Sequence, residues 1–212
     1  MENTQRALDK FTHINLDSAY WAGFILSSGS LNKNYQKYLT ISCKPKYIST
    51  LIAFCEFINI ETEKIKNNSN LRINSKDLTD SLKKNFNLVI DKKLNFEPPE
   101  LNNEICNKAF LKGLIEGKGS LFFLKNKLVY LSLNLNLDSY DFYRSKFNKW
   151  YGIDRNNISA EVRLANTRNL NMYRLKMSGK KASVILNDLH NLPTFRSPKW
   201  SIIDNHLYEK YK

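Results

Sequence analysis

The amino-acid sequence predicts an α+β fold in which one αββαββα unit occurs twice. Two stretches about ninety residues apart share one pattern: Tyr20–Leu31 reads YWAGFILSSGSL, and Phe110–Phe123 reads FLKGLIEGKGSLFF. Each runs from an aromatic residue through Gly and Ile to Gly-Ser-Leu. Each is followed by segments whose apolar residues alternate as in strands or recur at helical spacing. A period this long does not fit a solenoid repeat and indicates a duplicated domain.

The first half is expected to contain a helix, a hairpin, a second helix, a second hairpin and a third helix. Gly29 should end the first helix in a left-handed conformation. Asn67 and Asn68 are expected to form the turn of the second hairpin, and Ser75 or Asp77 to cap the third helix. In order, the expected elements cover residues 17–27, 30–34 with 38–43, 46–60, 63–76 and 75–86.

A linker near residues 91–104 is expected to separate the halves, because Pro98 and Pro99 exclude a continuous helix. The predicted domains are therefore residues 1–95 and residues 96–212. The second half repeats the order of elements and adds a last helix, with Asp138 or Ser139 as the cap of its second helix. Its expected elements cover residues 103–116, 120–136, 138–152, 158–178, 179–190 and 197–211.

The predicted strands place apolar side chains on one face and polar side chains on the other. In 129–136, Val and Leu alternate with Tyr, Ser and Asn, and other strands alternate apolar residues with Arg, Lys or Asn. A solvated face explains any single strand, but several such strands in a basic chain favour a face that contacts nucleic acid. The expected nucleic-acid-binding residues are Lys44, Arg72, Asn74, Lys76, Lys118, Tyr130, Ser132, Asn134, Asn136, Arg163, Arg168, Arg174 and Lys176.

The charge of the chain predicts a polyanionic partner. The net charge is +13, and residues 1–100 carry 14 basic and 11 acidic groups, whereas residues 101–212 carry 19 and 9. No apolar run approaches the length of a membrane span, so no membrane partner is expected. The three cysteines and three histidines lack metal-ligand spacing, so we expect reduced cysteines and neither a metal nor a cofactor.

The repeated segment resembles a known family. The stretches WAGFILSSG (Trp21–Gly29) and LKGLIEGKG (Leu111–Gly119) are similar to the LAGLIDADG signature of homing endonucleases and intron maturases, in the single-chain, two-repeat form. The resemblance implies two central motif helices that pack on small residues, here Ala22, Gly23 and Gly113. It also implies two pseudo-symmetric halves with saddle-shaped antiparallel sheets that grip nucleic acid.

The resemblance fails at the catalytic position. In active family members the eighth motif position is an acid that binds a divalent metal, but here it is Ser28 in the first copy and Lys118 in the second. Serine is a poor Mg²⁺ ligand, and a lysine ammonium repels a cation. Glu116 lies two residues earlier, where a helix points its side chain in another direction. We therefore expect no catalytic residues, with Glu116 as a residual candidate, while Lys118 either contacts a phosphate or is solvated.

Three functions remain open at this stage. The favoured one is a catalytically inactive protein that stabilises structured RNA, by analogy with the family's maturases. It would act as a component of a mitochondrial ribosome or ribonucleoprotein, with ribosomal proteins as neighbours, or as an intron maturase. The alternatives are a DNA endonuclease with an atypical metal site and a non-cleaving DNA-binding repressor. The 27 Asn residues, with many Lys and Ile, suggest an AT-rich coding genome and hence a mitochondrial location; no homo-oligomer is required.

Overall fold

The computed structural model describes residues 10–31, 38–67, 69–88, 97–123, 129–154, 158–164, 171–201 and 203–204. The chain forms two compact units. Unit 1 comprises the first 93 residues together with Pro99–Gly117 and Pro193–Pro198, and unit 2 comprises residues 94–98, 118–192 and 199–212. Both motif helices, up to Gly117, therefore belong to unit 1, so the compact units do not follow the boundary between the two sequence repeats.

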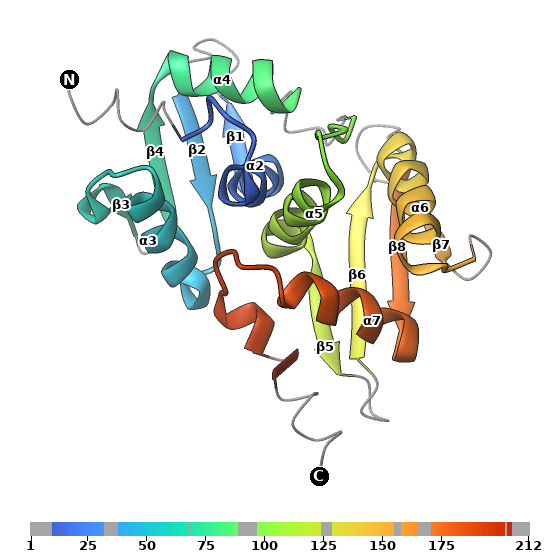
Figure 1. The fold of residues 1–212 in the computed structure, drawn as a ribbon. Helices are drawn as coiled ribbons and strands as arrows, with labels where there is room; N and C mark the ends of the chain where they lie inside the picture. The colour runs from blue at the N-terminus through green and yellow to red at the C-terminus, as the bar shows by residue number, and fades with distance from the viewer. Residues whose placement is uncertain are drawn as a thin grey trace. The chain divides into compact units, whose positions relative to one another are not determined.

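Unit 1 holds the elements of the first repeat together with the second motif helix, as Figure 1 shows by label. Its sheet has the strand order β1-β2-β4-β3, and all neighbouring strands are antiparallel. The elements are α2 (Leu16–Ser28), β1 (Gly29–Leu31), β2 (Tyr38–Ser42), η1 (Pro45–Tyr47), α3 (Ile48–Phe57), η2 (Thr62–Lys64), β3 (Ile65–Lys66), β4 (Asn70–Asn74), α4 (Lys76–Phe86) and α5 (Glu104–Lys118).

Local sequence explains where the first motif helix begins and ends. Asn15 accepts a hydrogen bond from the Ser18 backbone N–H, and Ser18 accepts one from the Asn15 N–H, which forms a capping box. The helix ends at Ser28, but Gly29 is extended, with φ −87° and ψ 159°. The predicted left-handed conformation was wrong. Glycine is needed here for space, because a Cβ would lie 2.4 Å from the carbonyl oxygen of Ile25.

Helices α2 and α5 pack against each other in direct backbone contact within unit 1 (Figure 1). A Cβ added at Gly23 would lie 2.0 Å from the carbonyl oxygen of Phe110, and one at Gly113 would lie 1.8 Å from that of Tyr20. The contact is reciprocal, since each glycine faces the backbone of the other helix. Any side chain at either position would push the helices apart.

The end of the helix pair has a third close approach, which the sequence reasoning missed. A Cβ at Gly117 would lie 1.8 Å from the Ser27 hydroxyl oxygen and 2.3 Å from that of Ser28. Ala22, the third residue expected at the helix interface, is fully buried. Small residues at Gly23, Gly113 and Gly117 therefore form the close seam.

The segment Pro193–Pro198 belongs to unit 1 and covers the aromatic side of α2. The Phe195 ring stacks on Trp21, with centroids 5.6 Å apart and planes at 24°, and it lies 6.4 Å from the ring of Tyr20. Trp21 also contacts the rings of Phe24 and Phe54. These contacts build one aromatic cluster around the first motif helix, and aromatic pairs of this kind add stability beyond their buried area.

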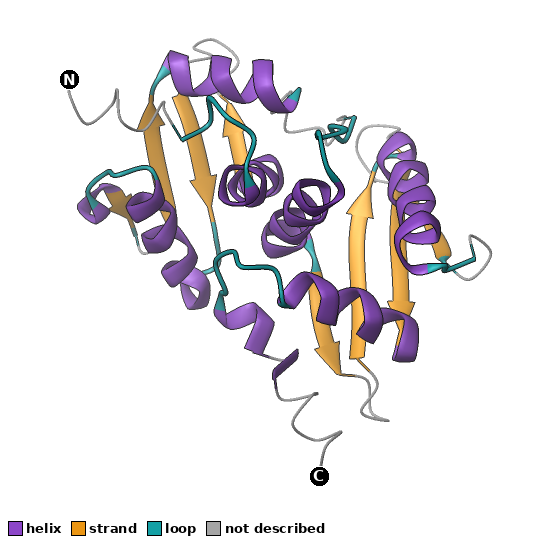
Figure 2. Cartoon of the chain, viewed as in Figure 1, coloured by secondary structure: helices purple, strands orange, loops and turns teal. Residues whose placement is uncertain are grey.

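Unit 2 repeats the architecture around a second antiparallel sheet. Its strand order is β5-β6-β8-β7, the counterpart of the order in unit 1. Figure 2 shows helices α6 and α7 lying over one face of this sheet. The elements are β5 (Ser120–Phe123), β6 (Val129–Leu135), α6 (Leu137–Tyr151), β7 (Ser159–Leu164), β8 (Asn171–Ser178), α7 (Gly179–His190) and η4 (Pro198–Trp200).

The cores of both sheets follow the predicted alternation. In the first sheet Leu39, Ile41, Leu71 and Ile73 are buried. In the second sheet every apolar residue of the Val129–Leu135 strand is at most 1% exposed, and Leu175 and Met177 of β8 join them. Burial of one face of each strand leaves the opposite face for polar side chains, which sets the position of the candidate interface.

The predicted fold class is confirmed: the chain is α+β, with two antiparallel sheets and the same αββαββα order in each repeat. Asn67 adopts the left-handed conformation that its turn requires, with φ 51°, whereas Asn68 lies outside the described residues. Ser75 caps α4 by accepting the Leu78 N–H. The predicted caps of α6 were wrong, because Asn136 takes that role by accepting the Ser139 N–H.

The helix seam makes a direct prediction about stability. Gly113→Ala should lower the free energy of unfolding by about 2–3 kcal/mol, because the new methyl group meets helix backbone that cannot rotate away. A loss of stability would point to the close helix contact, because alanine at a position without such a contact stabilises a helix by about 1 kcal/mol over glycine. Urea unfolding of wild type and variant measures the difference.

The exposed Asp80→Ala in α4 is the matched control and should change stability by less than about 0.5 kcal/mol. A Gly113→Ala protein as stable as wild type would contradict the close seam.

Candidate nucleic-acid interface

The second sheet presents a polar and aromatic face opposite its core. Cross-strand register sets Ser132 beside Lys176 and Asn134 beside Arg174. The Arg174 Nε–H donates a hydrogen bond to the Asn134 amide oxygen at 3.1 Å. Neutral side chains of β6 therefore face cations of β8, although Ser132 is buried, with 9% of its surface exposed. On its other side Arg174 is in register with Glu161 of β7. Such a face can hydrogen-bond sugars or base edges and hold phosphates at the same time.

An aromatic pair lies at the end of this face. Phe122 of β5 is directly opposite Tyr130 of β6, and their ring centroids are 4.5 Å apart. Phe122 is 41% exposed. The sequence reasoning selected Tyr130 and missed Phe122, although Phe122 directly follows the Gly-Ser-Leu of the motif.

The first sheet carries a comparable face. Thr40 lies opposite Arg72, Tyr38 opposite Asn74, and Ser42 opposite Asn70. The Arg72 guanidinium lies over the Tyr38 ring, 4.3 Å from its centroid. Both Arg72 and Asn74 are exposed.

Three predicted interface residues that continue a strand pattern in the sequence lie outside the strands, and Lys118 lies at the end of a helix. Strand β2 ends at Ser42, so Lys44 is an exposed residue before η1. Strand β4 ends at Asn74, and Lys76 is the first residue of α4. Asn136 uses its side chain as the cap of α6. The alternation of apolar and polar residues in the sequence continues past the ends of the strands, into the residues that precede or begin the next helix.

Two further arginines were predicted to contact nucleic acid. The backbone of Arg163 pairs with that of Met172 in the β7–β8 ladder. Arg168 lies outside the described residues.

Lys118, at the eighth position of the second repeated segment, is the last residue of α5. Its side chain is half-buried, and burial lowers the pKa of its ammonium group to about 8. Lys199 lies close to the end of this helix, because its Nζ donates a hydrogen bond to the Gly119 carbonyl oxygen at 3.2 Å. Cations at a helix C-terminus are stabilised by the helix dipole. This end of α5 therefore carries positive charge.

Glu116 is buried, only 4% exposed, and it is held by other groups of unit 1. The Ser197 hydroxyl donates to its Oε2 at 2.7 Å. Lys112, one helical turn before Glu116, is fully buried, and the carboxylate attracts its ammonium group. A buried carboxylate satisfied by such partners has a packing role that needs no metal.

The same cluster shifts two pKa values. Burial lowers the pKa of Lys112 to about 8, the nearby Arg196 adds to this lowering, and Glu116 opposes it. Burial, followed by the Glu116 carboxylate, raises the pKa of Tyr20 well above its ordinary value. The Lys112 Nζ lies 6.0 Å from the centroid of the Tyr20 ring. The interior of the helix pair thus holds linked ionisable groups.

Metal-ligating side chains do not gather in the described part of the chain. Within it, no group of three or more His, Cys, Asp or Glu residues could hold a metal ion. Cys55 and Cys106 are buried, Cys43 is half-buried, and all three are free thiols. Among the described residues, no helix is both long and apolar enough to cross a membrane.

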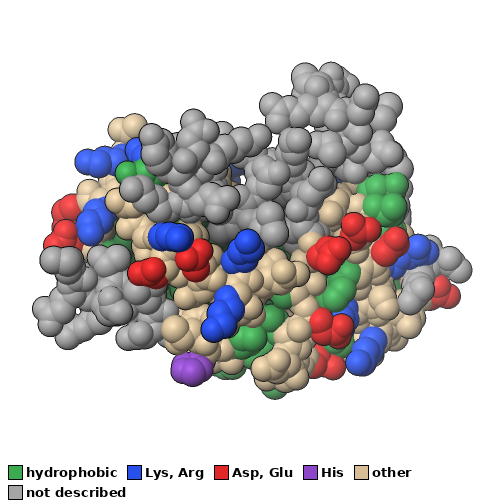
Figure 3. Space-filling view, turned by 90° about the horizontal axis from the view of Figure 1, so that it is seen from above, with side chains coloured by type: hydrophobic (Ala, Val, Ile, Leu, Met, Phe, Trp, Pro, Cys, Tyr) green, Lys and Arg blue, Asp and Glu red, His purple; other side chains and the backbone are tan. Residues whose placement is uncertain are grey.

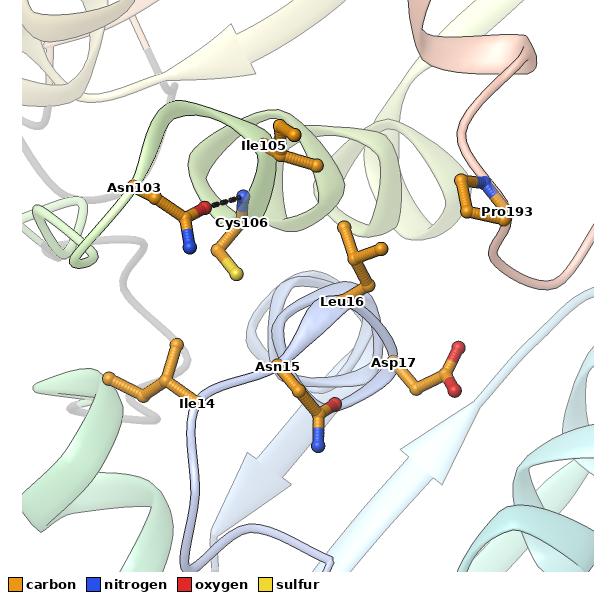
Figure 4. A pocket seen from close by; sticks show the side chains of 8 residues that line it. All are labelled: Ile14, Asn15, Leu16, Asp17, Asn103, Ile105, Cys106 and Pro193. Atoms are coloured by element: carbon orange, nitrogen blue, oxygen red, sulfur yellow. Dashed lines mark hydrogen bonds between the residues drawn. The ribbon is translucent and has the colours of Figure 1, made fainter.

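A hollow of about 500 Å³ lies at the N-terminal ends of α2 and α5 (Figure 4). Its polar groups already serve the helices: Asn103 accepts the Cys106 N–H at 2.7 Å, and Asn15 caps α2. The hollow is therefore not a candidate catalytic or ligand-binding site. Its lining residues are Ile14, Asn15, Leu16, Asp17, Asn103, Ile105, Cys106 and Pro193.

The face seen in Figure 3 mixes Lys and Arg with Asp and Glu side chains and shows no uniformly basic surface.

Comparison with solved structures finds a similarity to the N-terminal LAGLIDADG domain of DUF199/WhiA. The TM-score is 0.49 and the sequence identity 14%, over 96% of this chain and 95% of that chain. No protein-family model matches the sequence, and no curated protein matches it. The α+β class is defined by the strand order and antiparallel register of the two sheets themselves.

The buried Lys112 predicts a specific pH dependence of stability. Its folded-state pKa is about 8 and the ordinary value is 10.5, so the unfolded chain binds more protons between these pH values. Stability from this group therefore rises as the pH increases through that range. Relative to Lys112→Met, wild type should gain at most about 1.4 kcal/mol per pH unit from pH 8 to 10.

Urea unfolding at several pH values measures this difference. Lys83→Met, at an exposed position of α4, is the control and should give a curve parallel to that of wild type. Parallel curves for wild type and Lys112→Met would mean that Lys112 keeps an ordinary pKa.

Proposed function

We propose that this protein binds structured RNA without cleaving it, through the polar faces of its two sheets. The observation that carries the proposal is the register of β6 and β8, which sets Ser132 beside Lys176 and Asn134 beside Arg174. Hydroxyl and amide groups can pair with ribose 2′-OH groups, while the cations hold phosphates. The net charge of +13 supports a polyanionic partner.

The same geometry supports binding without hydrolysis. Metal-assisted cleavage needs anionic oxygens beside the scissile phosphate. Ser28 and Lys118 supply none, and Glu116 already accepts a hydrogen bond from Ser197. A half-buried Lys118 can instead contact a phosphate directly, as a fixed cation in place of a metal.

The proposal extends to an organellar role, supported by the compositional bias towards Asn, Lys and Ile. The RNA would be ribosomal RNA in a mitochondrial ribosome or ribonucleoprotein, or an intron bound by a maturase. Cross-linking in the native organelle, followed by sequencing of the attached nucleic acid, separates these cases. Recovery of DNA alone would favour the non-cleaving repressor instead.

The protein should not cleave DNA. Incubation with a library of duplex targets in Mg²⁺ or Mn²⁺ should give no specific double-strand breaks, because no carboxylate occupies either eighth motif position.

Reproducible cuts that disappear in Glu116→Gln would overturn this expectation and assign Glu116 to a metal site. Glu104→Gln, at an exposed position of the same helix, is the control that keeps any such activity.

Binding should depend strongly on salt and favour structured RNA over duplex DNA of equal length and charge. Replacing Arg174 and Lys176 together with Ala should weaken RNA binding and reduce the salt slope by about one per lost phosphate contact. Titrations between about 50 and 200 mM salt measure both quantities.

The double variant Lys83→Ala, Lys84→Ala removes the same charge from the exposed surface of α4 and should have a smaller effect. An Arg174, Lys176 variant that binds like wild type would remove this strand pair from the interface. Equal competition by DNA would favour the repressor alternative.

A further inference from the structure

Phe122 and Tyr130 form a pair of neighbouring rings on the second sheet, on which another planar group could stack. Phe122 is 41% exposed on the polar side of β5, while the opposite side of the sheet is core. Its ring is tilted by 33° against Tyr130, with centroids 4.5 Å apart. The two adjoining rings place a partly exposed aromatic surface on an otherwise polar sheet face, and burial of such a surface by a planar partner is favourable.

Cations lie beside the ring pair in register. Tyr130 is opposite Ser178, the next residues on the same face are Ser132 and Lys176, and then Asn134 and Arg174. Successive residues on one face of a strand are about 7 Å apart. Lys176 therefore lies one step along the strand from the aromatic row, and Arg174 two steps. A planar apolar group followed by an anion would match this order.

The corresponding tyrosine of the first sheet has a different described neighbour. Tyr38 and Tyr130 hold the same register position, because each lies two residues before the residue opposite a motif serine, Thr40 with Ser30 and Ser132 with Ser120. The Tyr38 ring is covered by the Arg72 guanidinium at 4.3 Å. The two repeats thus place one tyrosine at one position and give it different partners.

We propose that Phe122 and Tyr130 form a platform on which an unpaired nucleotide base stacks, with Lys176 and Arg174 holding the adjoining phosphates. The ligand class is a single-stranded or looped segment of RNA, because bases inside a duplex do not offer their faces. The first sheet, whose ring is paired with Arg72, holds backbone instead. This inference rests on the proposed RNA-binding function and adds which part of the RNA the second sheet recognises.

The test compares two RNA probes at about 150 mM salt, where phosphate attraction alone is screened. One probe is a hairpin with an unpaired loop, and the other is a fully paired RNA duplex with the same number of phosphates. Wild type should prefer the hairpin. Phe122→Ala should bind the hairpin about 5- to 100-fold more weakly, as for loss of one stacked base, and bind the duplex nearly as well as wild type.

Three further variants test whether the effect comes from the aromatic ring. Phe122→Leu keeps an apolar side chain without a ring and should lose hairpin preference, whereas Phe122→Trp should keep it. Val184→Ala removes a similarly exposed apolar group, 45% exposed on α7, and should bind both probes like wild type. Phe122→Ala and Phe122→Leu proteins that both bind the hairpin like wild type would overturn the platform.

The outcomes separate this inference from the function on which it rests. If wild type binds neither probe, the RNA-binding function itself fails. If both probes are bound and only the Arg174, Lys176 variant weakens them, RNA binding stands and the stacking platform is wrong. If Phe122→Ala keeps RNA affinity but no longer assembles into its native ribonucleoprotein, the ring covers a protein partner, which also overturns the platform.

Discussion

The backbone contact between α2 and α5 is the constraint on which unit 1 depends. Gly23 and Gly113 face the partner helix at distances that exclude any Cβ, and Gly117 meets Ser27 and Ser28 at the end of the seam. Glycine in a helix interior costs about 1 kcal/mol in helix propensity. The close packing and the burial around it, including the aromatic cluster of Trp21, offset that cost.

Ionisable groups are buried on the second motif helix. Lys112 and Glu116 lie one turn apart on α5, both buried, and Ser197 supplies a hydrogen bond to the carboxylate. A buried charge is tolerated when an opposite charge and hydrogen bonds satisfy it. The first repeat places Ala22 and Leu26 at the corresponding motif positions. One helix of the pair is therefore apolar inside, and the other carries an internal charge pair.

The two sheets share a scaffold but differ in surface chemistry. Strand order and register agree, and both sheets place a tyrosine at the same position. In unit 1 that ring is paired with Arg72, and in unit 2 with Phe122. Because the cores are set by the alternate residues of each strand, the outer faces are free to diverge without loss of the fold. The two repeats thus carry related surfaces with different side-chain chemistry.

The sequence by itself determined the repeat, the order of elements and the buried face of each strand, because periodicity and capping are local properties. It misplaced Lys44, Lys76 and Asn136, since alternation does not show where a strand ends and several neighbouring polar residues can cap a helix. Tertiary structure alone decided the state of Glu116, whose partner Ser197 lies 81 residues away. It also decided the pairing of Phe122 with Tyr130, because hairpin register brings together residues whose types do not predict their contact.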